Sequence, residues 1–184
     1  MHPLHPVIHV LQALLDDASV TSVQWVTLPG SAPQPQELLA RYLEHVRSCT
    51  LGIVRPAISE GTLRFRVAGT RLSLLEFALP PGAPPLPLPI TGGLLAGSAP
   101  EGTGTLEFSV RRGRRGSRMA VRLCGYHPAL LGRGRPRMYR KLLYGLTQAY
   151  IHRLVTVSFL RNICRTCGSR PVVTVVRPKK GEPI

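Results

Sequence analysis

The spacing of apolar residues predicts three amphipathic helices, over residues 6–17, 36–47 and 138–163. In each segment apolar side chains recur at intervals of three or four residues, so that they share one face of a helix. In the first segment these residues are Val7, Ile8, Leu11, Leu14 and Leu15. The last segment carries the longest such pattern and predicts the longest element of the fold, through Leu142, Leu143, Leu146, Tyr150, Leu154, Val157 and Leu160.

Alternation of apolar and polar residues predicts strands between these helices. A first strand is predicted over residues 19–28, before Pro29-Gly30. A hairpin follows, from 62–67 and 71–79 around the turn Ala68-Gly69-Thr70. Further strands are predicted at 90–95, 104–110, 118–126 and 171–176. The chain is therefore expected to have an α+β fold with several antiparallel strands.

The segment 80–89 contains six prolines, which forbid regular hydrogen bonding and favour an extended loop. It is either a loop inside one domain or a linker between two. Because the flanking strands look like parts of one sheet, and 184 residues suit a single core, we favour the loop.

Composition places the chain among globular proteins, with 43% hydrophobic and 18% charged residues. Polar residues interrupt the apolar stretch 142–160, so no membrane span is expected. The start, Met1 to Pro6, lacks the basic residues and cleavage site of a secretory signal, and four cysteines are too few for a disulfide framework. We therefore expect a cytoplasmic protein with reduced thiols.

The formal net charge of +15 is the one unusual global property. Such an excess attracts polyanions such as nucleic acid, or anionic surfaces. The candidate contacts lie in two basic segments, 111–118 and 133–141, and are Arg111, Arg112, Arg114, Arg115, Arg133, Arg135 and Arg137. The run Arg133-Gly134-Arg135-Pro136 also matches the core of an AT-hook, a minor-groove element. The alternative is a compositional bias that leaves a solvated basic rim.

The order strand, helix, antiparallel strands and long C-terminal helix resembles the helix-grip fold of the START-like (SRPBCC) ligand-binding superfamily. Residues 121–132, which include Tyr126-His127-Pro128-Ala129-Leu130, followed by 139–163, are similar to its uncharacterised bacterial branches. The resemblance implies a curved antiparallel sheet that grips the C-terminal helix, with an apolar cavity between them. The domain organisation would then be an N-terminal helix (1–18), a START-like domain (19–163) and a tail with a short strand (164–184).

Candidate ligand contacts lie at the end of the last strand of this domain and on the long helix. Tyr126 ends the strand, and Tyr144, Gln148 and His152 follow at intervals of four residues, which places them on one helix face. The alternative is that the helical three face solvent.

Metal and catalytic signals are weak. Cys164 and Cys167 have the form of one zinc knuckle, but no second cysteine pair completes it, so structural thiols are favoured over a metal or redox site. His2, His5 and His9 cluster in a terminal segment, where a metal site is less favoured than coincidence. No nucleophile elbow, phosphate-binding loop or dinucleotide fingerprint occurs.

The sequence therefore favours binding or sensing of an apolar, lipid-like or polycyclic small molecule, without a cofactor. A basic nucleic-acid-associated module is the alternative, and a cyclase or hydrolase on the same fold is a third hypothesis that rests on fold analogy alone.

Overall fold

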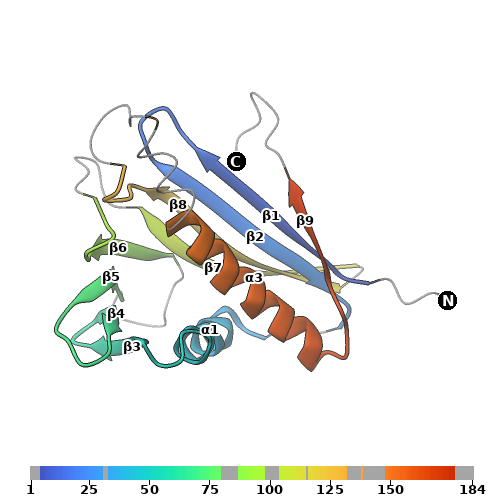
Figure 1. Ribbon diagram of the computed structural model, residues 1–184. Coiled ribbons are helices and arrows are strands. Elements are labelled where there is room, and N and C mark those ends of the chain that lie inside the picture. Colours follow the sequence, from blue (N-terminus) through green and yellow to red (C-terminus); the bar gives the residue numbers. More distant parts are fainter. Residues whose placement is uncertain are drawn as a thin grey trace.

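The computed structural model describes residues 5–30, 33–79, 87–97, 104–114, 116–131, 138 and 148–176. In these residues nine strands form one curved sheet, and two helices, α1 and α3, accompany it (Figure 1). The N-terminal half contains β1 (Val7–Leu14), β2 (Val20–Leu28), α1 (Pro35–Cys49), β3 (Val54–Ser59), β4 (Thr62–Val67) and β5 (Ser73–Ala78). The C-terminal half contains β6 (Leu88–Gly92), β7 (Thr105–Gly113), β8 (Gly116–Tyr126), α3 (Gln148–Thr166) and β9 (Val172–Val176).

The strands lie in the order β3-β4-β5-β6-β7-β8-β2-β1-β9. Neighbours are antiparallel except β1 and β9, which are parallel, so the sheet is mixed. Strands β3 to β8 follow chain order, whereas β2 pairs with β8, about 100 residues later in the chain. This long-range pairing joins the N-terminal strands to the last strand of the antiparallel series.

Alternate residues of the strands form the core beneath the two helices. On β2 and β8 the buried inward-facing residues include Val26, Met119 and Val121, while the intervening positions face outward. Helix α3 packs against β1 and β2, and α1 packs against β3, β7 and α3. The aromatic ring of Tyr42 on α1 makes edge contacts with Phe108 of β7 and Phe159 of α3, so both helices belong to one core.

The predicted N-terminal helix over residues 6–17 is wrong. Residues Val7–Leu14 form β1, which pairs along its whole length with β2 and, from Val7 to Leu11, with β9. Ile8 and Val10 are fully buried on the core face, and their spacing of two is the strand period. Val7 and Leu11 lie on the opposite face of this strand, which has a neighbour on each side, so apolar residues occur on both faces and also fit a helical spacing.

Most other predicted elements are confirmed, with three differences. The strand predicted at 90–95 is β6 (Leu88–Gly92), so it begins inside the segment 80–89 that was expected to be a loop, and residues 80–86 of that segment lie outside the described residues. The strand β3 was not predicted, because Pro56 interrupts its pattern, and β3 lies at the sheet edge where a missing backbone donor is tolerated. Helix α3 ends at Thr166, three residues later than predicted, and most of its predicted first part, 139–147, lies outside the described residues. The final strand is confirmed as β9 and belongs to the main sheet.

In the part of the chain that the structure describes, no helix combines the length and apolar character needed to cross a membrane.

Candidate ligand-binding cavity

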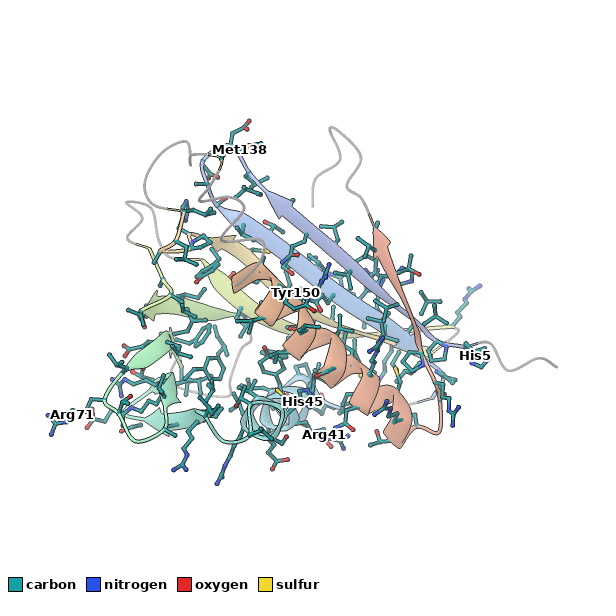
Figure 2. The ribbon with its side chains drawn as sticks, viewed as in Figure 1. His5, Arg41, His45, Arg71, Met138 and Tyr150 are labelled. Carbon is teal, nitrogen blue, oxygen red and sulfur yellow. The ribbon has the colours of Figure 1, made fainter. Side chains whose placement is uncertain are left out.

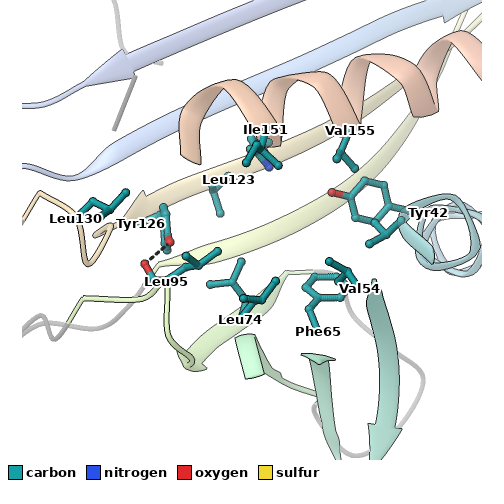
Figure 3. Close-up of a pocket in the computed structure, with 13 residues that line it drawn as sticks. Tyr42, Val54, Phe65, Leu74, Leu95, Leu123, Tyr126, Leu130, Ile151 and Val155 are labelled. Carbon is teal, nitrogen blue, oxygen red and sulfur yellow. Dashed lines mark hydrogen bonds between the residues drawn. The ribbon is translucent and has the colours of Figure 1, made fainter. Parts of the chain in front are cut away.

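A cavity of about 420 Å³ lies between the sheet and the two helices (Figure 3). Helix α1 and helix α3 form one side, and strands β3, β4, β5 and β8 form the other. The described residues that line it are Tyr42, Val46, Val54, Phe65, Leu74, Leu75, Leu95, Leu123, Tyr126, Leu130, Ile151, His152 and Val155. Ten of these thirteen side chains are wholly hydrocarbon, so the cavity is predominantly apolar.

Helical and strand periods together direct these residues inward. On α3, Ile151 and Val155 are four residues apart and share one helix face. On β8, Leu123 belongs to the alternating set that faces the helices, and Tyr126 continues this face after Gly125, which has a φ of +60°. The local change of backbone at Gly125 allows two residues three apart to reach the same cavity.

The hydroxyl of Tyr126 is directed to the backbone rather than free in the cavity. It donates a hydrogen bond of 2.6 Å to the carbonyl oxygen of Leu95, in the segment after β6 (Figure 3). The backbone amide of Ala129 donates to the same oxygen at 2.9 Å. Tyr126 therefore fixes the position of Leu95, and both residues form one rim of the cavity.

The two remaining polar side chains of the lining, Tyr42 and His152, are neutral at pH 7. Burial raises the pKa of Tyr42 to about 12. Burial lowers the pKa of His152 to about 4. Part of the His152 residue is accessible to solvent, but its imidazole lies against the apolar lining, and this desolvation disfavours the charged form. The described lining thus offers hydrogen-bonding groups without a fixed charge.

Two of the four predicted ligand contacts, Tyr126 and His152, line this cavity. Tyr144 and the side chain of Gln148 lie outside the described residues. Sequence reasoning missed Tyr42, which lies within the amphipathic helix predicted over residues 36–47 and was not among the predicted ligand contacts. The hydroxyl group on an otherwise apolar helix face was the available signal, because a buried tyrosine hydroxyl usually needs a polar partner.

The predicted basic segments are described only in part. Arg111, Arg112 and Arg114 are exposed on the β7–β8 hairpin, whereas Arg115, Arg133, Arg135 and Arg137 lie outside the described residues. Arg111 pairs across the hairpin with Arg118. The pKa of Arg118 is lowered by burial and then by the charges of Arg111 and Arg122.

The outer face of the sheet also contains an aromatic contact that sequence reasoning missed. Trp25 of β2 stacks with the His9 ring of β1, with centroids 4.9 Å apart, and the Arg118 guanidinium lies 4.7 Å from the Trp25 centroid. These three residues come from adjacent strands. His9 is therefore placed beside a tryptophan in the sheet, whereas His2 of the histidine cluster considered for metal binding lies outside the described residues.

The pair Cys164 and Cys167 belongs to the C-terminal end of α3. The amide of Ser169 donates to the carbonyl of Cys164, the amide of Gly168 donates to that of Arg165, and Gly168 has a φ of +70°. These bonds form a Schellman motif, which explains the glycine after the second cysteine. Cys164 is fully buried, and burial raises the pKa of its thiol to about 11, whereas Cys167 is exposed. The described residues contain no group of three or more potential metal ligands.

The described lining of the cavity carries few groups for acid–base chemistry. Its described lining contains no carboxylate, thiol or aliphatic hydroxyl, and His152 is its one group that titrates near neutral pH in a free peptide. Comparisons of the chain with protein-family models, curated proteins and solved structures gave no match.

Proposed function

We propose that this protein binds a neutral, apolar small molecule in the cavity beneath α1 and α3, as a carrier or sensor. The observation that carries the proposal is the composition of the lining, in which ten hydrocarbon side chains surround three uncharged polar groups. Ligand sites in proteins commonly have this character, with volumes of about 300 to 1,000 Å³. A cavity of about 420 Å³ lies within that range.

The arrangement of elements supports a helix-grip fold for this chain. Strand β2, helix α1, strands β3 to β8 and helix α3 follow one another in the order that suggested the START-like resemblance. The sheet is curved, and the cavity lies between it and the C-terminal helix, as that resemblance implies. Strands β1 and β9 are additions at one edge of this arrangement.

The electrostatics of the lining favour a neutral ligand over a fatty acid. A buried carboxylate needs a cation or several hydrogen-bond donors to offset its desolvation. Neither Tyr42 nor His152 carries a positive charge at pH 7, and the other described lining residues are not ionisable in this range. We expect a polycyclic or lipid-like molecule with a carbonyl or hydroxyl group.

A variant that fills the cavity tests this proposal with a matched control on the same helix. Val155 lines the cavity, whereas Leu154 is half-exposed and does not. Val155→Trp should abolish binding of a solvatochromic lipophilic dye, and Leu154→Trp should retain it. Native mass spectrometry of the purified protein then shows whether a lipid-like mass copurifies and is lost in Val155→Trp.

Equal dye binding by wild type, Val155→Trp and Leu154→Trp would refute binding in the cavity. Thermal unfolding separates a loss of dye binding in Val155→Trp from misfolding, because a variant whose cavity is filled keeps the cooperative transition of the native protein.

Polyanion binding is a second candidate function, favoured by one observation. Arg111 and Arg118 lie directly opposite one another on β7 and β8, and Arg122 adds to the positive potential at Arg118. If this face and the hairpin contact about 6 to 10 phosphates of a nucleic acid, affinity should fall about 10³- to 10⁵-fold between about 50 and 200 mM salt. Affinity that is insensitive to salt would exclude it.

A further inference from the structure

Three exposed apolar residues lie in two adjacent segments, where the α1–β3 loop meets the β4–β5 turn. Leu51 is 90% exposed, Ile53 is 60% exposed and Leu72 is 53% exposed. The amide of Ala68 in the turn donates to the carbonyl of Ile53 in the loop at 2.8 Å, so the two segments are side by side. With three arginines described below, these residues form what we call the corner patch: Leu51, Ile53, Leu72, Arg55, Arg66 and Arg71.

The backbone of Leu51 departs from ordinary preference. Its φ is +53°, in the left-handed region that glycine and asparagine adopt far more readily than leucine. A bulky apolar residue at this position contributes strain to the folded state, and at 90% exposure it gains little from burial. Its side chain is therefore better explained by a contact outside the chain than by the stability of the chain itself.

The charged residues near these apolar residues are also arranged unfavourably for the stability of the chain. Arg55 of β3 pairs directly with Arg66 of β4, and like charges in opposite positions of an antiparallel pair are unfavourable. Arg71 projects outward from the β4–β5 turn (Figure 2). Ion pairs among the described residues join Arg41 to Glu37, Arg64 to Glu76 and Arg122 to Glu107, and none includes an arginine of the corner patch.

We propose that the corner patch docks on an anionic lipid surface. Exposed leucine and isoleucine side chains enter the boundary between headgroups and acyl chains, while flanking arginines contact the anionic headgroups. A nucleic acid would satisfy the arginines but would leave three large apolar side chains in water. The lipid surface accounts for both the apolar and the basic members of the patch.

The position of the patch adds a reason for such docking. Val54, Phe65 and Leu74 line the cavity, and each lies within two residues of a member of the patch, on β3, β4 and β5 respectively. Strands β3 and β4 and the turn before β5 would thus contact the lipid, while the same strands and β5 enclose the proposed ligand. This link rests on the proposed function, whereas docking itself does not require an occupied cavity.

Co-sedimentation with lipid vesicles tests the inference directly. We expect the full chain to bind vesicles of phosphatidylcholine mixed with phosphatidylglycerol, and to bind pure phosphatidylcholine much more weakly. Each basic residue near such a surface contributes about 1 kcal/mol, so the double variant Arg55→Gln/Arg66→Gln should bind about 30-fold more weakly. Leu51→Asn/Ile53→Thr should bind about tenfold more weakly at the same lipid composition.

Matched controls distinguish the patch from general charge or hydrophobicity. Ile58→Thr removes an exposed apolar residue, 61% exposed, at the other end of β3, and Arg112→Gln/Arg114→Gln removes two exposed charges from the β7–β8 hairpin. Both should bind like wild type. Asparagine adopts the left-handed backbone readily, so Leu51→Asn should fold normally, which circular dichroism and thermal unfolding will check.

Three results would overturn the proposal: no preference for phosphatidylglycerol, equal losses in the patch and control variants, or no loss in the patch variants. Because the assay contains only protein and vesicles, its outcome is independent of dye binding in the cavity. Docking without dye binding would retain this inference and remove the carrier hypothesis. Dye binding without docking would remove this inference and retain the carrier hypothesis.

Discussion

The hydroxyl of Tyr126 donates a 2.6 Å hydrogen bond to the backbone carbonyl of Leu95, although the two residues are 31 positions apart. Around this bond, the amide of Gly97 donates to the carbonyl of His127, and Ala96 forms a bridge with Pro128. The end of β8 is thereby joined to the segment after β6. Because Tyr126 and Leu95 both line the cavity, the stability of this junction sets the shape of the cavity rim.

Tyr126→Phe should lower the free energy of unfolding by about 1 kcal/mol, the usual net contribution of one hydrogen bond. The loss is limited because the Leu95 carbonyl keeps its bond from the Ala129 amide. Urea denaturation measures the change. Tyr150→Phe is the control, since Tyr150 is exposed on α3, and it should leave stability unchanged. A cost for Tyr150→Phe as large as that for Tyr126→Phe would contradict the assignment.

The two helices are joined by a second specific bond, between His45 of α1 and Ser158 of α3. Nε2 of His45 and Oγ of Ser158 are 2.6 Å apart. The Ser158 hydroxyl also donates to the carbonyl of Val155 at 3.2 Å, so the bond between helices is completed by donation from His45. Burial lowers the pKa of His45, which keeps the imidazole neutral at pH 7.

A double-mutant cycle of His45→Ala and Ser158→Ala measures this bond. We expect each single variant to lower the free energy of unfolding, and a coupling energy of about 0.5 to 1.5 kcal/mol between the two positions. Additive effects of the two substitutions would show that the bond contributes nothing to the packing of α1 on α3.

Local pattern was sufficient for most of the sheet and insufficient at its added edge. The hairpin of β4 and β5 was predicted because its alternation and turn are local properties. Segment 7–14 was assigned to a helix because its apolar residues fit both periods, and the choice depends on β2 and β9. The parallel pairing of β9 with β1 joins residues about 165 positions apart, which no local pattern encodes.

The part of the candidate site that lies on one face of α3 could be predicted from residue spacing in the sequence. The position of His152 on α3 suggested a cavity contact, and it lines the cavity. Tyr42 was missed because its role depends on the packing of α1 beside α3, a tertiary contact. The corner patch was missed for a similar reason, because the pairing of Arg55 with Arg66 follows from the unpredicted strand β3.

Gly116 at the start of β8 should tolerate no side chain. Its φ is +132°, and an added Cβ would clash with the backbone carbonyl oxygen of Leu28. Gly116→Ala should therefore cost several kcal/mol, about 2 to 4, because the backbone of β2 or β8 must shift. Gly113→Ala is the matched control in the same hairpin, since its Cβ would meet only an ordinary contact at 3.6 Å. Thermal unfolding of both variants measures the difference, and equal melting temperatures would show that β2 and β8 separate easily there.

The low pKa of His152 gives stability a predictable dependence on pH. In the unfolded chain the imidazole takes up a proton near its ordinary pKa of about 6.5, whereas in the folded chain burial delays protonation to about pH 4. Between these values the unfolded state binds more protons, so lowering the pH favours unfolding. Above about pH 6.5 His152 does not change the free energy of unfolding with pH. Between about pH 6.5 and 4 it lowers that free energy by at most about 1.4 kcal/mol for each pH unit of acidification.

Urea denaturation from pH 7.5 to 4, compared between wild type and His152→Gln, isolates this contribution. Burial also lowers the pKa values of His9 and His45, so some loss of stability on acidification should remain in the variant. The free energy of unfolding of wild type minus that of His152→Gln should be constant above about pH 6.5. Below that pH it should fall steadily, because only wild type must keep an imidazole at position 152 uncharged. Parallel curves across the whole range would mean that the His152 ring is hydrated in the folded protein, and the assignment of a desolvated, uncharged cavity wall would then be wrong.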